Sequence, residues 1–266
     1  MAGSAGAAAA AHMDYTAGKM TEALVAIVNS SWFDKESFQT EKLKLSQAFC
    51  LLWQDPESGD VSGRKSGVEC QAAAAAAGIV DLIVMDRVEI EVQPNKTLGI
   101  KDDNILLKVK NEKPTGTYLD GPLFDDIAEH HNKKPGNPEK VKKVIWRDIA
   151  HMRTKSQVAT NTLDSLVELG ILDMKEKFVG RKYPTAKPGV EESLRDQIRS
   201  VVLDGAEPNS YIHALLIISR MADKVSMNTP VLKKCFTKDE YDRAKDKMNA
   251  MIDFSNDKSE AKYKPL

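Results

Sequence analysis

Residues 68–85 read Val-Glu-Cys-Gln-Ala-Ala-Ala-Ala-Ala-Ala-Gly-Ile-Val-Asp-Leu-Ile-Val-Met and form the longest apolar segment of the sequence. Alanine, isoleucine, valine and leucine fill most of it, so the pattern predicts a helix that is buried on most sides. Its longest apolar part, residues 72–85, contains Asp81 and is shorter than the roughly 18 residues that a bilayer span requires. We therefore expect the core helix of a soluble protein.

Further helices are expected on both sides of this core helix. Residues 42–53 carry apolar side chains at the spacing of a second core helix, and residues 121–130 also look helical. Residues 141–169 predict one or two amphipathic helices, which Gly170 would end in a C-cap position. The later helices are expected at residues 190–203, 208–225 and 238–252.

Short strands are predicted in two places. Residues 88–92 alternate apolar and polar side chains with period two, and residues 105–109 are the expected partner strand. Residues 171–174 and 178–183 flank Lys175-Glu-Lys177 in the pattern of a β-hairpin. We therefore predict a mostly α fold, a single globular helical domain with a short β-hairpin and a few short strands.

The two ends of the chain differ in composition from the middle. Residues 1–13 are small and alanine-rich and end in His-Met, as an expression linker does, so they take no part in the fold prediction. We expect a tag-like or disordered tail at residues 1–19 and the domain itself at 20–238. A C-terminal helix and charged tail would follow at 239–266, and the last residues should fray.

Composition and charge exclude several classes of protein. Of the 266 residues, 42% are hydrophobic and 29% charged, which excludes wholesale disorder, a collagen-like repeat and a membrane-spanning bundle. Lys and Arg total 38 against 39 Asp and Glu, a net charge of -1, so any affinity for anions must come from a local patch. We expect no nucleic-acid partner. Cys50, Cys70 and Cys235 fit buried thiols in a reducing compartment.

Catalytic and metal-binding patterns are scarce. The sequence has no Gly-rich phosphate loop, no nucleophile elbow and no paired Cys-x-x-Cys. His130 and His131 are adjacent, so on a helix they would point about 100° apart and suit a solvated pair better than metal ligands. His213 lies in an apolar run and suits a core position. We therefore predict no catalytic residue, no metal, no cofactor and no enzymatic activity.

One charge asymmetry lies between residues 133 and 155. Glu139 and Asp148 are the acids that interrupt it. The basic residues are Lys133, Lys134, Lys140, Lys142, Lys143, Arg147, Arg153 and Lys155. A solvated helix face is one interpretation. A surface for phosphate groups is the other, because each Lys or Arg near an anionic bilayer contributes about 1 kcal/mol.

The predicted hairpin adds a second basic cluster. Lys177, Arg181 and Lys182 surround the aromatic residues Phe178 and Tyr183. An aromatic tip flanked by cations suits shallow insertion at a membrane interface. Packing of the two rings in the core is the alternative, and the sequence leaves both open.

Four segments resemble one known family in the same order along the chain. They are residues 114–128 (Pro-Thr-Gly-Thr-Tyr-Leu-Asp-Gly-Pro-Leu-Phe-Asp-Asp-Ile-Ala), 166–172 (Leu-Val-Glu-Leu-Gly-Ile-Leu), 182–185 (Lys-Tyr-Pro-Thr) and 201–208 (Val-Val-Leu-Asp-Gly-Ala-Glu-Pro). Together with the helix that follows, they resemble the Golgi phosphoprotein 3-like family over about residues 41–225. The resemblance implies a mostly helical domain with a short hairpin. It also implies attachment to the cytosolic face of Golgi membranes through phosphatidylinositol 4-phosphate, and partnership with the cytosolic tails of Golgi membrane enzymes such as glycosyltransferases.

The chain departs from this family at the lipid site. Members that bind the phosphoinositide use a Trp and three Arg, and the matching positions fall near Ser66, Ala75, Ser156 and Ala159. Losing bidentate guanidinium contacts should cost several kcal/mol, which predicts weakened lipid binding. Arg64, Lys65, Arg153 and Lys155 lie close enough in sequence to substitute.

We therefore expect a non-enzymatic peripheral membrane adaptor of Golgi trafficking that binds phosphatidylinositol 4-phosphate or another anionic lipid. The candidate lipid-binding residues are Arg64, Lys65, Arg147, Arg153, Lys155, Lys177, Arg181 and Lys182, and the candidate membrane contacts are Phe178 and Tyr183. The alternatives are a soluble interaction scaffold that has lost the lipid, and a small-molecule binder or enzyme on the same fold. The sequence also leaves a homo-oligomer open.

Overall fold

The computed structural model describes residues 3–61, 67–93, 104–150, 157–177, 180–225 and 230–252. Helices make up most of this part of the chain and enclose one hydrophobic core, so the predicted mostly α single domain is confirmed. The helices are α1 (Gly3–Val28), α2 (Lys35–Gln39), α3 (Leu45–Trp53), α4 (Gly67–Val84), α5 (Asp125–Lys133), α6 (Val141–Ala150), α7 (Val158–Glu168), α8 (Pro188–Arg199), α9 (Ser210–Val225) and α10 (Lys238–Ile252). Short π-helical segments η1 (Asp120–Phe124) and η2 (Ser200–Asp204) lead into α5 and extend α8, and η3 (Leu232–Cys235) is a 3-10 turn.

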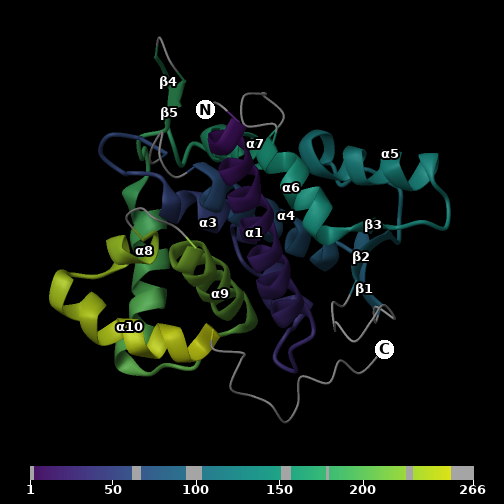
Figure 1. Ribbon diagram of the computed structural model, residues 1–266. Helices are drawn as coiled ribbons and strands as arrows, with labels where there is room; N and C mark the ends of the chain where they lie inside the picture. The colour runs from purple at the N-terminus through teal and green to yellow at the C-terminus, as the bar shows by residue number, and fades with distance from the viewer. Residues whose placement is uncertain are drawn as a thin grey trace.

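Helix α4 is the centre of the fold, as its composition predicted. It packs against α1, α3, α6, α7 and α9. Figure 1 shows α1 crossing in front of it, with α5 and the three-stranded sheet on one side and α8 and α10 on the other. Among the described helices, α4 alone is long and apolar enough to cross a membrane by length and composition, but most of it is buried inside the fold.

Small residues let the neighbouring helices approach α4 closely. Residues 72–77 are six alanines without exposed surface. A Cβ atom added to Gly78 would lie 3.1 Å from Leu123, 3.2 Å from Val158 and 3.3 Å from Leu119, all of them apolar side chains. Gly78 is therefore the point at which α4 meets both α7 and η1.

The two predicted β-structures are present, with one difference. Strand β1 (Val88–Gln93) pairs antiparallel with β2 (Asn104–Val109), as expected, and β2 also pairs with β3 (Glu139–Lys140). The hairpin consists of β4 (Lys175–Glu176) and β5 (Arg181–Lys182). Residues 175–177 were predicted as its turn, but Lys175 and Glu176 are paired strand residues. Gly180 has a φ of +83°, which glycine adopts without strain, so the turn lies further along the chain.

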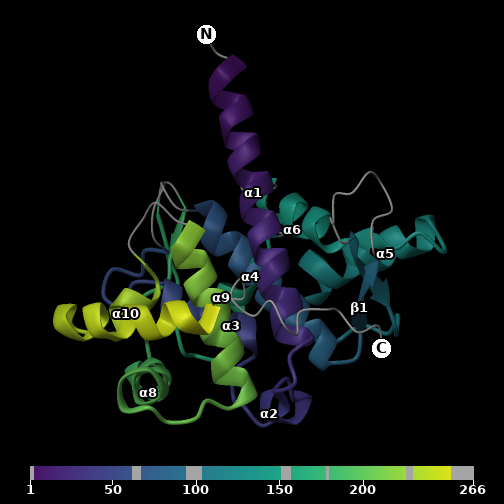
Figure 2. The ribbon, with the colours of Figure 1, turned by 60° about the horizontal axis from the view of Figure 1, so that its bottom comes forward.

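The N-terminal segment differs from the expected disordered tail. Helix α1 runs through the predicted boundary at residue 19, and Thr16 and Ala17 are fully buried. Alanine has the highest helix propensity, which favours this extension. The imidazole of His12 lies 2.9 Å from the carboxylate of Glu69 on α4. Figure 2 shows the start of α1 extending beyond the body of the fold.

Three buried aspartates join helices end to start. Asp81 near the end of α4 accepts hydrogen bonds from the backbone N–H groups of Leu45 and Ser46, where α3 begins. Asp148 near the end of α6 accepts a hydrogen bond from the backbone N–H of Val158, where α7 begins. Asp223 near the end of α9 accepts hydrogen bonds from the backbone N–H groups of Val231 and Leu232, in the turn that contains η3. Burial raises the pKa of Asp81 to about 6 and the pKa values of Asp148 and Asp223 to about 7. Each carboxylate satisfies N–H groups that the next segment leaves without an intrahelical partner.

Replacing Gly78 by valine should lower the free energy of unfolding by about 2 kcal/mol, because the added methyl groups overpack the junction of α4, α7 and η1. Urea denaturation of the wild type and the variant measures this difference. Gly189→Val on α8 is the matched control, since nothing lies within 4 Å of an added Cβ there. Equal effects of the two substitutions would show that the Gly78 contact does not limit packing.

Candidate functional site

The predicted lipid-binding and membrane-contact residues separate into two groups. Arg64, Lys65, Arg153, Lys155 and Phe178 lie outside the described residues. The other five lie within the described residues: Arg147, Lys177, Arg181, Lys182 and Tyr183. All of these except Lys177 make side-chain hydrogen bonds or ion pairs inside the fold.

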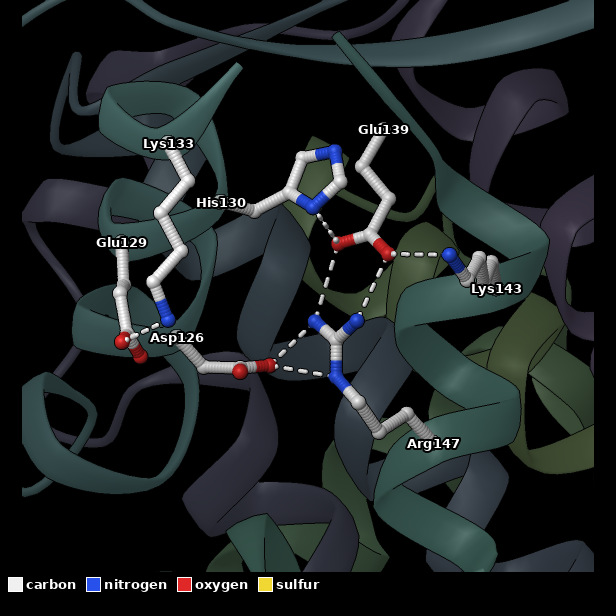
Figure 3. Close-up of polar contacts among 7 residues, drawn as sticks. All are labelled: Asp126, Glu129, His130, Lys133, Glu139, Lys143 and Arg147. Atoms are coloured by element: carbon white, nitrogen blue, oxygen red, sulfur yellow. Dashed lines mark hydrogen bonds and ion pairs between the residues drawn. The ribbon is translucent and has the colours of Figure 1, made fainter.

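Arg147 on α6 is held by two carboxylates (Figure 3). Its Nη1 and Nη2 atoms donate to Glu139 of β3 at 2.6 and 2.9 Å, and its Nε donates to Asp126 of α5 at 2.7 Å. The side chain of Glu139 is only 3% exposed, so its charge has little contact with water. The guanidinium of Arg147 thus bridges α5, β3 and α6, and its lipid contact stays a prediction.

The pKa of Glu139 shows how strong this pairing is. Burial alone would raise the pKa of Glu139, but the hydrogen bonds and charge of Arg147 outweigh burial and keep the pKa below its usual value. Glu139 also lies 3.9 Å from the imidazole of His130 and 3.4 Å from the amine of Lys143. The cluster is therefore a structural charge network that joins three elements.

Most other lysines of the basic segment are also paired. Lys142 donates to Asp14 of α1 at 2.7 Å, and Lys133 pairs with Glu129 one turn earlier on α5. These acids lie before residue 133 in the sequence, so the charge count over residues 133–155 did not include them. Lys134 and Lys140 are exposed and have no ion pair with the described residues.

The base of the hairpin is held by two further acids. Arg181 donates to Asp164 of α7 at 2.7 Å, and the hydroxyl of Tyr183 donates to the same carboxylate at 2.8 Å. Lys182 donates to Asp60 at 3.0 Å. Tyr183 is only 2% exposed, and burial raises its pKa to about 12.

These contacts correct the predicted membrane contact of Tyr183, because a buried ring cannot reach a bilayer. The alternative, core packing, holds for this residue. Arg181 and Lys182 are paired with acids, and their lipid contacts stay predictions. Lys177 is exposed on the hairpin, which extends away from the helices in Figure 1.

Two positions near the family's lipid-binding arginines carry buried alanines. Ala75 on α4 has no exposed surface, and Ala159 on α7 is 3% exposed. A guanidinium could not be placed at either position without moving the neighbouring helices.

A cavity of about 890 Å³ lies between the start of α3, the end of α4 and α7. The carboxylate of Asp81 lines it and accepts a hydrogen bond from the hydroxyl of Ser46 at 2.6 Å. That hydroxyl also lies 2.7 Å from the hydroxyl of Tyr118. Lys42, Lys44 and Glu168 line its rim. The cavity thus combines bonded polar groups with a charged rim, which the sequence did not reveal.

The histidines follow their predictions only in part: His130, predicted in a solvated pair, is only 19% exposed and faces a buried carboxylate, and His213, predicted in the core, is half-buried. His213 stacks on Trp32 with ring centroids 4.1 Å apart, and burial lowers the pKa of His213. His130 faces Glu139, whereas His131 lies 4.0 Å from Glu112. No group of three metal-ligating side chains occurs within the described ranges.

Comparison with models of known protein families identifies the family of this chain. The sequence model of a protein family described as Golgi phosphoprotein 3 (GPP34) matches residues 45–262. This range contains α3 to α10, the sheet and the hairpin. No curated protein matches the chain.

Replacing Arg147 by methionine should lower the free energy of unfolding at pH 7 by about 3 kcal/mol, because Glu139 then remains as a poorly compensated buried charge. In the wild type the lowered pKa of Glu139 means that its stabilisation is present above its usual pKa and is lost as the pH falls. The difference between variant and wild type should therefore shrink as the pH is lowered. Denaturation curves at several pH values measure it.

Two controls accompany the Arg147 variant. Lys133→Met removes an exposed ion pair and should change stability little, because surface pairs contribute little. Adding Glu139→Gln to Arg147→Met should restore part of the loss. If Arg147→Met lowers the free energy of unfolding by the same amount at every pH, the lost stability does not come from the charge of Glu139.

Proposed function

The chain belongs to the Golgi phosphoprotein 3 family, and from this we propose that it is a non-enzymatic peripheral adaptor on the cytosolic face of Golgi membranes. The observation that carries the proposal is the family match, which extends over most of the chain. Its ligands in this proposal are phosphatidylinositol 4-phosphate, or a related anionic lipid, and the cytosolic tails of Golgi membrane enzymes.

The cations that bind the lipid in this proposal are Arg64, Lys65, Arg153, Lys155 and Lys177. The support is electrostatic: Arg147, Arg181 and Lys182 already have carboxylate partners within hydrogen-bond distance, so a lipid phosphate would have to displace those partners. Arg64 and Arg153 also supply the planar guanidinium that binds phosphate through two parallel hydrogen bonds.

Binding should be weaker than in a member that keeps the family's Trp and Arg positions, and it should depend strongly on salt. Exposed charges more than about 10 Å apart are screened at 0.1 M ionic strength, so an interaction made by surface cations falls as salt rises. A soluble scaffold that has lost the lipid remains the alternative function. It predicts no binding at any salt concentration.

Replacing Arg64, Lys65, Arg153 and Lys155 together by glutamine should abolish co-sedimentation with vesicles that contain phosphatidylinositol 4-phosphate. Each cation near an anionic surface contributes about 1 kcal/mol, so losing four leaves little affinity. The measurement compares these vesicles with phosphatidylcholine vesicles at low and high salt.

The matched control replaces four cations that are exposed in the structure, Lys134, Lys238, Arg243 and Lys245, by glutamine. The net charge changes equally in both variants, so a general electrostatic effect would weaken both to the same degree. Equal loss in the two variants would contradict the proposed residues. No sedimentation of the wild type with either lipid would favour the soluble scaffold.

A further inference from the structure

The buried carboxylates of this fold differ in whether a basic side chain accompanies them. The buried glutamates are paired: Glu69 with His12, Glu139 with Arg147 and Glu191 with Arg195. Asp81 is 4% exposed, and its hydrogen-bond partners are two backbone N–H groups and one hydroxyl. Burial raises the pKa of Asp81 and the charge of Lys44 opposes this rise, but no cation of the described residues forms an ion pair with this carboxylate. Burying a charge without a counter-charge costs free energy, and a cation bound beside Asp81 would offset that cost.

Asp81 and Tyr118 both line the cavity between α3, α4 and α7, and both offer hydrogen-bond acceptors there. Ser46 donates its hydroxyl hydrogen to Asp81, so the hydroxyl of Tyr118, 2.7 Å from the Oγ atom of Ser46, donates to Ser46. The oxygen of Tyr118 therefore keeps an acceptor lone pair. The Oδ1 atom of Asp81 accepts one bond, from the N–H of Leu45, and also keeps a lone pair. A ligand that complements this part of the cavity must supply N–H donors.

Apolar side chains form the wall around these acceptors. Phe38 comes from α2 and Leu43 from the segment before α3, Val84 and Met85 lie where α4 ends, and Leu169 lies at the end of α7. The side chain of Leu169 is 50% exposed. Exposed apolar surface at a concave site is typical of ligand-binding sites, and the cavity volume of about 890 Å³ is usual for a small molecule. The wall therefore suits a ligand with an apolar body.

Acids outnumber bases among the side chains that line the cavity. The acids are Glu41, Asp81, Asp164 and Glu168, and the bases are Lys42 and Lys44. Lys42 is exposed to solvent, so its charge is screened by water. The charge of the lining therefore favours a cationic ligand over an anionic one.

We propose that this cavity binds a small organic cation, an amine or guanidinium held by Asp81 and Tyr118, on a short apolar body that packs against Met85 and Leu169. The cation supplies the N–H donors and the counter-charge that Asp81 lacks. This ligand site goes beyond the adaptor function and does not depend on it, because none of its residues is among the proposed lipid-binding cations. Lipid binding and cavity binding can therefore be tested separately on the same protein.

Phenethylamine and phenethyl alcohol are suitable probes, because they share one apolar body and differ in whether its end is a cation or a neutral hydroxyl. Phenethylamine should bind about tenfold more tightly than the alcohol, since a hydrogen bond between charged groups contributes more than one to a neutral group. An NMR titration of the isotope-labelled full chain measures both dissociation constants. The amide signals of Thr117, Tyr118 and Leu169 should shift with added ligand.

Asp81→Asn removes the charge and keeps an acceptor oxygen. It should abolish the preference for the amine and leave the affinity for the alcohol unchanged. Asp223→Asn is the matched control, because Asp223 is 8% exposed and also accepts two backbone N–H groups but does not line the cavity. Phenethylamine should bind this control as tightly as it binds the wild type.

The pH dependence of the wild type tests the proposal even if Asp81→Asn does not fold, as judged by circular dichroism. Burial raises the pKa of Asp81 to about 6, so its carboxylate is charged above this pH and neutral well below it. The affinity for phenethylamine should fall about tenfold as the pH drops through this value, while the affinity for the alcohol stays constant. The groups that face Asp81 are Lys44, Cys50, Tyr118 and Tyr211, and burial raises the pKa values of the last three, which stay uncharged in this range.

Several results would overturn the inference. One is equal affinity of the wild type for the amine and the alcohol, or binding of neither. Another is an unchanged preference for the amine in folded Asp81→Asn, or an amine affinity that does not change with pH. Equal losses of amine binding in Asp81→Asn and Asp223→Asn would also overturn it. None of these results bears on vesicle binding, so the adaptor function stands or falls by its own test.

Discussion

The burial of α4 determines how the other helices are arranged. A helix that is apolar on all sides must be surrounded, and α1, α3, α6, α7 and α9 do this. Its alanines and Gly78 set how closely these helices approach. Asp81 provides the polar contact that α3 needs at its start, so the central helix both packs its neighbours and caps one of them.

The same packing determines which charges are available at the surface. Because α5, β3 and α6 converge, Arg147 meets Asp126 and Glu139 and is used within the fold. Because the base of the hairpin lies against α7, Arg181 and Tyr183 meet Asp164. A chain with nearly equal numbers of acids and bases satisfies many of its cations internally. Any affinity for phosphate must come from the cations that this pairing leaves over.

Much of the fold could be predicted from the sequence because its signals are local. The apolar run at residues 68–85, the alternation at 88–92 and the glycine after residue 169 each specify an element through its own residues. The family resemblance also held, since it rested on four ordered segments within the matched range. The extent of α1 was missed because the alanine-rich start of the chain was set aside as a linker.

The site residues were harder to predict because their state depends on partners from other elements. From the sequence of its own helix, Arg147 is predicted to be a free cation. Asp126 lies 21 residues away in the sequence, and only the fold brings it next to Arg147. Tyr183 reads as an aromatic tip residue, and only its contact with α7 shows that it is buried. Charge pairing between elements is a tertiary property, so a count along the sequence cannot reveal it.

The division between paired and available cations can be measured directly by NMR. A titration of the isotope-labelled protein with soluble inositol 1,4-bisphosphate would follow the Nε–H signals of the arginine side chains. We predict that the signals of Arg64 and Arg153 shift with added ligand, while those of Arg147 and Arg181 stay in place. Shifts at Arg147 and Arg181 without any at Arg64 and Arg153 would contradict this division between paired and available cations.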